Sequence, residues 1–357
     1  VPASIEACRT AGVRVAMITG DNSMTAHSIA HEVGIDSAGL EEHLVVTGDE
    51  LESLEESALA EKLKHVTIFS RILPRQKMRI VKAFRAIGEV VAMTGDGVND
   101  APALKYADIG IAMGERGTQV AREAADMVLL NDDFATIVAT IRDGRKIYDN
   151  SRKAMEYILV IHIPIALSAL AAPILGLPTL LMPIHVVLLE MIIDPTCSIV
   201  FERQPAEADI MSRPPRPTNS SIISKEILAK ALLQGLVIFA AIFGSYLYLL
   251  PRGSAEHART FFLVVLVLSN LFLVYVNRSD KVSAFAKNPE VVFDPVPWII
   301  NLAILGGLTL LSSVPALASA AKLQPLSALE FASAFAIAFA AAFWWEAVKY
   351  FKRHRQA

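Results

Sequence analysis

The chain has 357 residues, of which 54% are hydrophobic and 19% are charged, and its mean hydropathy is +0.45. This composition is more apolar than that of an ordinary soluble protein, and the length allows two or three domains. The formal net charge of −3 gives no excess of positive charge for binding a polyanion, so no nucleic-acid partner is expected. The two cysteines, Cys8 and Cys197, lack CxxC spacing, which disfavours a disulfide framework or a thiolate zinc site.

Charged residues are unevenly distributed along the chain. Of the 69 Asp, Glu, Lys and Arg residues, 42 lie in residues 1–156 and 27 in the longer remainder. We therefore predict a soluble domain over residues 1–150 and a membrane domain over residues 151–357. The amino terminus has neither a basic region nor an apolar core of the kind found in signal peptides, and the sequence looks cut from a longer chain.

The first half alternates short apolar runs, rich in β-branched residues, with amphipathic stretches. Such alternation predicts an α/β fold with a parallel sheet covered by helices, and chemistry at the carboxyl ends of its strands. The expected strands are residues 13–18, 66–69, 89–93, 108–113 and 126–130.

The second half contains six apolar segments long enough to cross a bilayer, which takes about 20 helical residues. They are residues 157–177, 179–201, 227–250, 261–276, 296–321 and 326–350. Residues 134–156 contain no proline, so one helix can run from the soluble domain into the first span; a kinked linker at Gly144 is the alternative. Lys and Arg are concentrated in alternate loops and in the tail, which predicts that both ends are cytoplasmic. We expect a multi-pass protein in contact with lipid, in the plasma membrane of a bacterium.

Two expected strands end in similar sequences, Thr19-Gly20-Asp21-Asn22 and Thr94-Gly95-Asp96-Gly97-Val98-Asn99-Asp100. The second places two carboxylates four residues apart, and its glycines let a ligand approach the backbone. Carboxylates that leave room for water and phosphate oxygens suit Mg²⁺. Lys77, early in an expected helix, can bring a positive charge to a phosphate. The alternative is that these residues are polar turns that cap helices.

At these residues the chain resembles the P-type ATPases, cation pumps of the haloacid-dehalogenase-like superfamily. The resemblance continues through Gly114–Thr118 and Asp132–Phe134 to the six spans, and residues 209–216 look like the corresponding loop of the calcium and sodium/potassium branch. It implies ATP as substrate and Mg²⁺ as cofactor. It also implies that Asp96 binds Mg²⁺ with support from Asp100 and Asn99, that Thr19, Gly20 and Asp21 form the phosphate-binding strand end, and that Lys77 neutralises the transferring group.

The sequence departs from the family pattern in one respect that decides activity. The nucleophilic aspartate of the family lies in a DKTG sequence, and no DKTG occurs in this chain. The actuator domain, most of the nucleotide-binding domain and the first four spans are likewise expected on a missing amino-terminal portion of the same chain. We therefore expect this chain alone to form no aspartyl phosphate and to hydrolyse no ATP.

The second span carries two carboxylates, Glu190 and Asp194, on one helix face. An intramembrane charge is costly, so these residues are candidate ligands of a transported cation, and Pro195 can free a backbone carbonyl beside them. The alternative is a pair satisfied by a neighbouring helix. His162 in the first span is a candidate ligand, a proton carrier or a packing residue, and Asn270 in the fourth span is a candidate ligand or an interhelical contact.

The position that aligns with an acidic ligand of calcium pumps is Ile165, and His162 falls where those pumps have an amide. This small number of candidate ligands suggests one ion per cycle and disfavours calcium as the transported ion. The leading hypothesis is a cation pump. A membrane-tethered phosphatase and an inactive remnant of a pump are the alternatives, and the buried carboxylates speak against the first of these.

Overall fold

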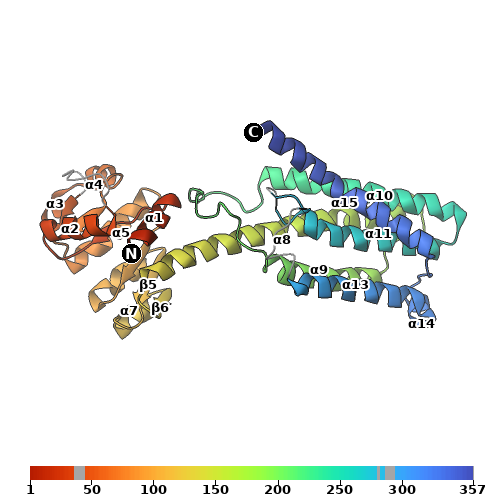
Figure 1. The fold of residues 1–357 in the computed structure, drawn as a ribbon, viewed down its shortest axis with the longest axis horizontal. Helices are drawn as coiled ribbons and strands as arrows, with labels where there is room; N and C mark the ends of the chain where they lie inside the picture. Colours follow the sequence, from red (N-terminus) through yellow and green to blue (C-terminus); the bar gives the residue numbers. More distant parts are fainter. Residues whose placement is uncertain (36–44, 280–281, 286–293, 357) are drawn as a thin grey trace. The chain divides into compact units, whose positions relative to one another are not determined.

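The structure, a computed structural model, describes residues 1–35, 45–279, 282–285 and 294–356 (Figure 1). It separates into two units. The first contains Val1–Arg145 and Ala206–Ser220, and the second contains Lys146–Pro205 and Ser221–Ala357.

The first unit contains two parallel sheets of three strands each, where the sequence suggested one sheet. Their orders are β1-β3-β2 and β4-β5-β6, so β1 and β4 are both edge strands among the described residues. The strands are β1 (Met17–Ile18), β2 (Val45–Thr47), β3 (Ile68–Ser70), β4 (Ala92–Gly95), β5 (Ile109–Met113) and β6 (Met127–Leu129). The sequence-based expectation missed β2, whose short Val-Val-Thr run lies directly after residues outside the described range.

In the part of this unit that the structure describes, eight helices or helical turns precede α8 (Phe134–Ile174) and connect or flank the strands. They are α1 (Pro2–Thr10), α2 (Ser23–Val33), α3 (Gly48–Ser53), α4 (Glu56–Lys62), α5 (Pro74–Ala86), the 3₁₀ turn η2 (Val98–Asp100), α6 (Ala101–Tyr106) and α7 (Gln119–Ala124). Helix α5 packs against both sheets: its Val81 belongs to the cluster that contains Met93 of β4, and Ile18 of β1 packs on that same cluster. The residues that follow both edge strands contact the start of α5: the N–H of Ile72 donates to the carbonyl oxygen of Thr19 at 3.0 Å, and Lys77 pairs with Asp100.

Residues 206–220 join the first unit through Arg145. Its guanidinium donates hydrogen bonds to the carbonyl oxygens of Ile210 and Arg213, each at 2.9 Å, and to that of Ala11 at 2.7 Å. A Cβ atom on Gly12 would lie 2.7 Å from Cδ of Pro215, so the loop also packs closely against the end of α1.

Six helices of the described residues are long and apolar enough to cross a membrane, which confirms the expected architecture. They are α8 (Phe134–Ile174), α9 (Pro183–Pro195) with the π-helical turn η3 (Thr196–Phe201), α10 (Lys225–Leu249) with the 3₁₀ turn η4 (Leu250–Arg252), α11 (Ala255–Val276), α13 (Pro295–Ser313) and α15 (Ala328–Gln356). Helix α8 is continuous through Gly144, so the sequence alternative of a kinked linker at that residue is not seen.

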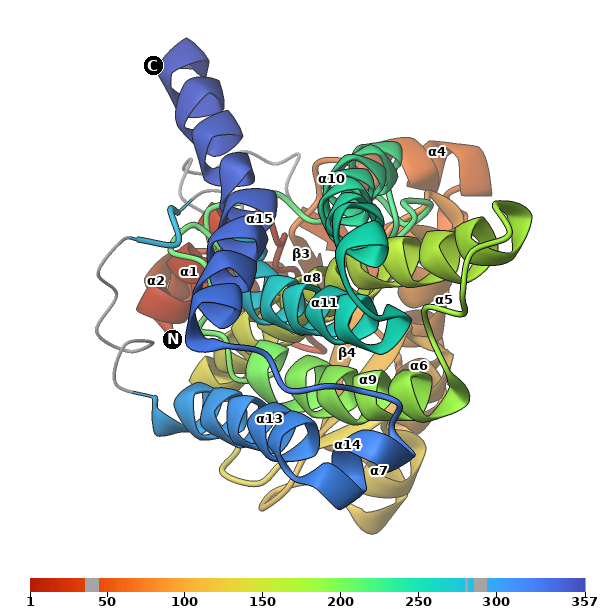
Figure 2. The ribbon, with the colours of Figure 1, turned by 90° about the vertical axis from the view of Figure 1, so that its right-hand side faces the viewer.

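Helix α11 lies in the middle of the second unit, with α10, α15 and α9 around it (Figure 2). Of its candidate span, 89% is buried. Some buried polar groups of this unit are paired with one another, which lowers the cost of their burial. Gln234 and Asn277 exchange two hydrogen bonds, at 3.3 and 3.1 Å, and the buried Glu156 and Lys230 form an ion pair.

Two helices differ from the expected spans. Helix α11 begins at Ala255 rather than at residue 261, because the guanidinium of Arg259 is buried and donates to the carbonyl oxygens of Thr179 and Lys322. The fifth expected span, residues 296–321, is divided at Val314 into α13 and α14 (Pro315–Ala320). Val314 has an extended ψ of 116°, as expected for a residue that precedes proline.

Candidate functional site

The first candidate site lies at the carboxyl ends of β1 and β4. Thr19 follows β1 directly, and its hydroxyl donates to Oδ2 of Asp21 at 2.9 Å. The backbone N–H of Asp21 in turn donates to Thr19 Oγ1 at 3.1 Å. Gly20 and Asp21 are exposed, so the backbone and side chains of this turn are accessible to a phosphate group.

The second turn, residues 95–100, closes around the side chain of Asp100. Oδ2 of Asp100 accepts from the N–H groups of Asp96 and Gly97, each at 3.3 Å, and Asp100 is only 4% exposed. A Cβ atom on Gly95 would lie 2.5 Å from Cβ of Asp100, so only glycine fits there without a shift. The turn therefore buries Asp100 and leaves the Asp96 and Asn99 side chains exposed.

Lys77 joins this turn from the first turns of α5. Its Nζ lies 2.5 Å from Oδ1 of Asp100, and the two side chains are 21% and 6% exposed. Both oxygens of Asp100 are thus engaged by protein donors. The Asp100 carboxylate thus links Lys77 to the turn that carries Asp96.

The residues present fit a magnesium site built around Asp96. Mg²⁺ keeps several waters and binds through one or two carboxylates together with substrate phosphates. Asp96 supplies an exposed carboxylate at a strand end with glycines on both sides. Asp100 contributes by holding Lys77 and the turn, because its own oxygens already accept three hydrogen bonds.

A second carboxylate organises the loop after β5. Asp132 accepts from the N–H groups of Gly114, Glu115 and Arg116, at 2.6, 3.2 and 2.8 Å, and its side chain is 5% exposed. Burial opposes ionisation, but the backbone N–H groups and the Arg116 side chain hold the pKa of Asp132 below its ordinary value. The sequence marked this segment only through a family resemblance.

The second candidate site lies between α8 and α9. Nε2 of His162 lies 3.5 Å from Oε1 of Glu190, and each side chain is 44% exposed. Sequence reasoning selected both residues but did not pair them, because 27 other residues separate them along the chain. The structure therefore brings these two candidate residues into contact.

Asp194 lies one turn beyond Glu190 and is exposed, and Pro195 ends α9. Proline has no N–H to donate to the carbonyl four residues earlier, that of Met191, and the chain continues as the π-helical turn η3. The hydroxyls of Thr196 and Ser198 donate to the carbonyls of Ile192 and Asp194, at 2.8 and 2.5 Å. The helix is thus irregular beside the two carboxylates.

Asn270 on α11 is fully buried, and neither atom of its side-chain amide has a hydrogen-bond partner among the described residues. A buried amide without partners costs about 1–3 kcal/mol, which makes Asn270 a candidate for contact with a group outside the described protein atoms. In the described part of the chain, no three His, Cys, Asp or Glu side chains converge as a metal cluster. The candidate membrane ligands therefore form a pair, His162 and Glu190, rather than a closed cage.

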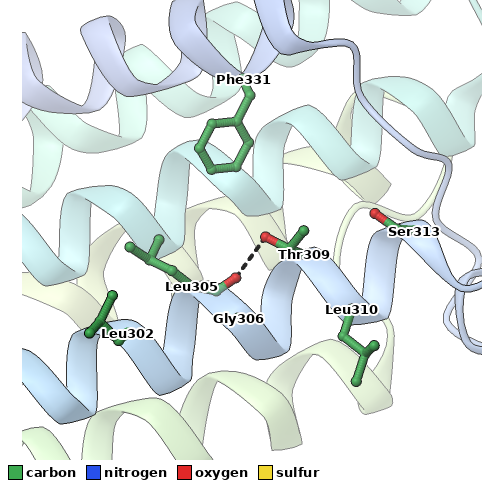
Figure 3. Close-up of a pocket in the computed structure, with 7 residues that line it drawn as sticks. All are labelled: Leu302, Leu305, Gly306, Thr309, Leu310, Ser313 and Phe331. Carbon is green, nitrogen blue, oxygen red and sulfur yellow. Dashed lines mark hydrogen bonds between the residues drawn. The ribbon is translucent and has the colours of Figure 1, made fainter.

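An apolar groove lies elsewhere, between residues 302–313 of α13 and Phe331 of α15 (Figure 3). The Thr309 hydroxyl in it donates to the carbonyl of Leu305 at 2.8 Å, within the same helix. None of the candidate site residues lines this groove.

Comparison with known proteins matches the two units to two kinds of family. The family described as "Cation transporting ATPase, C-terminus" matches residues 178–351. Two families described as "haloacid dehalogenase-like hydrolase" match residues 1–108 and 79–141.

Curated relatives give the same result. The chain is 39% identical over 284 residues to "Probable cation-transporting ATPase F" of Mycobacterium tuberculosis, covering 79% of this chain and 31% of the relative. It is 37% identical over 361 residues to "Calcium-transporting ATPase 1" of Yarrowia lipolytica, and the match covers 99% of this chain and 38% of the relative. For "Calcium-transporting ATPase" of Bacillus subtilis the identity is 37% over 289 residues, and the match covers 80% of this chain and 32% of the relative. The chain spans about a third of the length of these relatives.

Proposed function

Because the chain belongs to the P-type cation-transporting ATPases, we propose that it is part of a pump that moves a cation across a membrane at the expense of ATP. The pump forms an aspartyl phosphate, and it returns to its starting state when that phosphate is hydrolysed. The chain contributes the carboxyl-terminal part of the phosphorylation domain and six membrane helices. ATP is the substrate and Mg²⁺ is the cofactor.

The observation that carries the proposal is the position of β1 and β4. Both are edge strands among the described residues, both pack on α5, and both end in the candidate phosphate and magnesium residues. One further parallel strand between them would join the two sheets and place its carboxyl end beside Lys77 and Asp96. We propose that the amino-terminal portion of the longer polypeptide supplies this strand and, at its end, the nucleophilic aspartate.

In this reaction Lys77 compensates negative charge on the phosphoryl group, and Asp100 holds Lys77 in place. The Thr19 hydroxyl and the backbone of Gly20 and Asp21 bind phosphoryl oxygens. Asp96 would hold the Mg²⁺, with Asn99 beside it, and a bound Mg²⁺ supplies charge stabilisation to the transferred group.

The membrane site favours a transport function over that of a membrane-tethered phosphatase. A helix that serves only as an anchor has no use for Glu190 and Asp194, because each intramembrane charge costs about 2.5–3.5 kcal/mol on insertion scales. We place both ends of the chain on the cytoplasmic side of a bacterial plasma membrane, as the distribution of Lys and Arg favours.

Asp96→Ala in the complete pump tests the catalytic assignment. The expected result is loss of phosphoenzyme formed from radiolabelled ATP, because no metal-binding carboxylate is left at the end of β4. Glu115→Gln, an exposed side chain in a neighbouring loop, is the matched control and should retain phosphorylation. A normal phosphoenzyme level in Asp96→Ala would refute the assignment. The chain without its amino-terminal portion should show no ATPase activity above a vector-only membrane control.

Glu190→Gln or Asp194→Asn tests the transport assignment. Each change should abolish ion-stimulated phosphorylation by ATP and leave phosphorylation by inorganic phosphate intact, since the second reaction needs the soluble site and an empty membrane site. Glu256→Gln, on the first turn of α11, is the control. Wild-type ion affinity in either site variant would assign that carboxylate a structural role.

A further inference from the structure

The hydrogen bond on one side of the His162 ring selects one tautomer of the neutral ring. Nδ1 of His162 lies 2.8 Å from the carbonyl oxygen of Ile158. A carbonyl oxygen only accepts, so the ring proton of a neutral imidazole is on Nδ1. Nε2 then carries a lone pair. Metal-binding histidines typically have this arrangement, in which the second ring nitrogen donates to a backbone carbonyl and orients the ring.

The lone pair of Nε2 faces a second electron-pair donor. Oε1 of Glu190 lies 3.5 Å away, and the two side chains come from different helices, α8 and α9. Two such electron-pair donors repel each other unless a proton or a metal ion lies between them. With metal–nitrogen and metal–oxygen bonds of about 2.1 Å and a tetrahedral angle, the two ligand atoms would lie about 3.4 Å apart. The observed spacing of 3.5 Å is close to that of a metal-bridged pair.

We propose that His162 and Glu190 bind the transported ion directly, and that this ion is a divalent transition metal of the Zn²⁺ or Co²⁺ type rather than Ca²⁺. The proposal rests on the transport function argued above. Imidazole nitrogen is a preferred ligand of such metals, whereas Ca²⁺ takes six to eight oxygen ligands. A site with a nitrogen ligand on α8 therefore favours the transition metal.

Further coordination positions are open at this pair. Each side chain is 44% exposed, so water or other ligands have access to the ion. The Met191 carbonyl, whose usual helical donor is replaced by Pro195, and the carboxylate of Asp194 lie on the same helix as Glu190. Transport requires release as well as binding, and a site with few protein ligands suits an ion that must leave.

The test uses the complete pump in proteoliposomes, with Zn²⁺, Co²⁺ and Ca²⁺ each supplied alone. Phosphorylation from ATP should reach half its maximum at a Zn²⁺ or Co²⁺ concentration at least about tenfold below that of Ca²⁺. His162→Asn should raise the half-maximal Zn²⁺ and Co²⁺ concentrations more than about tenfold, since loss of even an outer partner of a metal ligand costs about 10–100-fold. The same change should leave the half-maximal Ca²⁺ concentration within about threefold of that of the unchanged pump.

A matched control and a direct readout separate the possible causes. His257→Asn removes another histidine that faces a carboxylate, that of Glu330 at 2.8 Å, and should leave the metal response unchanged. Visible absorption of bound Co²⁺ reports nitrogen ligation without any turnover, and His162→Asn should remove that signal.

Each outcome has a distinct meaning. The ion assignment is wrong if Ca²⁺ stimulates phosphorylation at lower concentrations than Zn²⁺ and Co²⁺ do. It is also wrong if His162→Asn leaves the Zn²⁺ response unchanged. Neither result contradicts the proposed transport function. Co²⁺ absorption that depends on His162, without phosphorylation by any ion, supports the metal site and refutes the proposed pump. If Co²⁺ gives no such absorption, a proton rather than a metal bridges the pair, and the inference is wrong.

Discussion

Replacing Arg145 by Met tests how residues 206–220 are held in the first unit. The guanidinium donates to three carbonyl oxygens, those of Ala11, Ile210 and Arg213, at 2.7–2.9 Å. Methionine keeps most of the apolar stem and removes every donor. The carbonyls of Ile210, Arg213 and Ala11 then lose their common partner, and only packing still holds the loop against the end of α1.

The size of the effect follows from the three hydrogen bonds. A hydrogen bond from a charged donor contributes about 1.5–3 kcal/mol to the free energy of unfolding. Because Arg145 is only part-buried, we take a lower contribution of about 1 kcal/mol for each bond. The expected loss is about 3 kcal/mol. For a unit of 150–250 residues this corresponds to a decrease in Tm of about 6–12 °C.

Thiol labelling of Cys8 provides the assay. Cys8 lies in α1 of the same unit and is 1% exposed, and Cys197→Ser leaves Cys8 as the only thiol in the chain. Burial raises the pKa of Cys8, and the positive charge of Arg145 opposes that rise. Arg145→Met therefore raises the pKa of Cys8 further and slows labelling of the folded protein. If the variant is nevertheless labelled at a lower temperature than the parent, the cause is unfolding and not a more reactive thiol.

Two further variants make the result decisive. Arg142→Met removes an exposed arginine three residues earlier on α8 and should leave the Tm within about 1 °C. Arg145→Lys keeps the charge but replaces the planar fork by a single ammonium, and should recover less than half of the loss. If Arg145→Met unfolds at the temperature of the parent, the three hydrogen bonds contribute no net stability and the reasoning is wrong.

Two other predictions concern the loop after β5 and the helix packing. The pKa of Asp132 is held below its ordinary value in the folded protein, so its contribution is present above about pH 3.9, the ordinary aspartate value, and is lost as the pH falls through the lower folded value. Asp132→Asn should thus lower the Tm at pH 7, and the difference from the parent should shrink below about pH 4; a constant difference from pH 7 to pH 3 would contradict this. A Cβ on Gly235 of α10 would lie 2.7 Å from Cβ of Ile163 on α8, whereas nothing lies within 4 Å of one on Gly244. Gly235→Val should destabilise the second unit by about 1–3 kcal/mol in thermal unfolding, and Gly244→Val should not; equal effects would show that helix propensity rather than close packing decides.

The sequence by itself determined the local features of this protein. Six spans, the parallel strands and the two strand-end turns were predictable, because hydropathy over about 20 residues and short motifs are read along the chain without knowledge of packing. The catalytic and transport roles of the residues in those turns and spans stay predictions. The strand β2 and the break at Val314 were missed, since a three-residue strand and a single proline carry little periodic signal.

Only the tertiary structure decided which side chains meet. The sequence named His162 and Glu190 separately, and the packing of α8 against α9 places their facing atoms 3.5 Å apart. The sequence assigned Asp100 to a metal, and the fold engages both of its oxygens with Lys77 and two backbone N–H groups. Arg145 contacts residues 65 and 68 positions away in the loop and a residue 134 positions away at the end of α1. Periodicity gives the face of a helix on which a residue lies, but the rotation and register of two packed helices depend on all the side chains between them, and those settle which pairs come into contact.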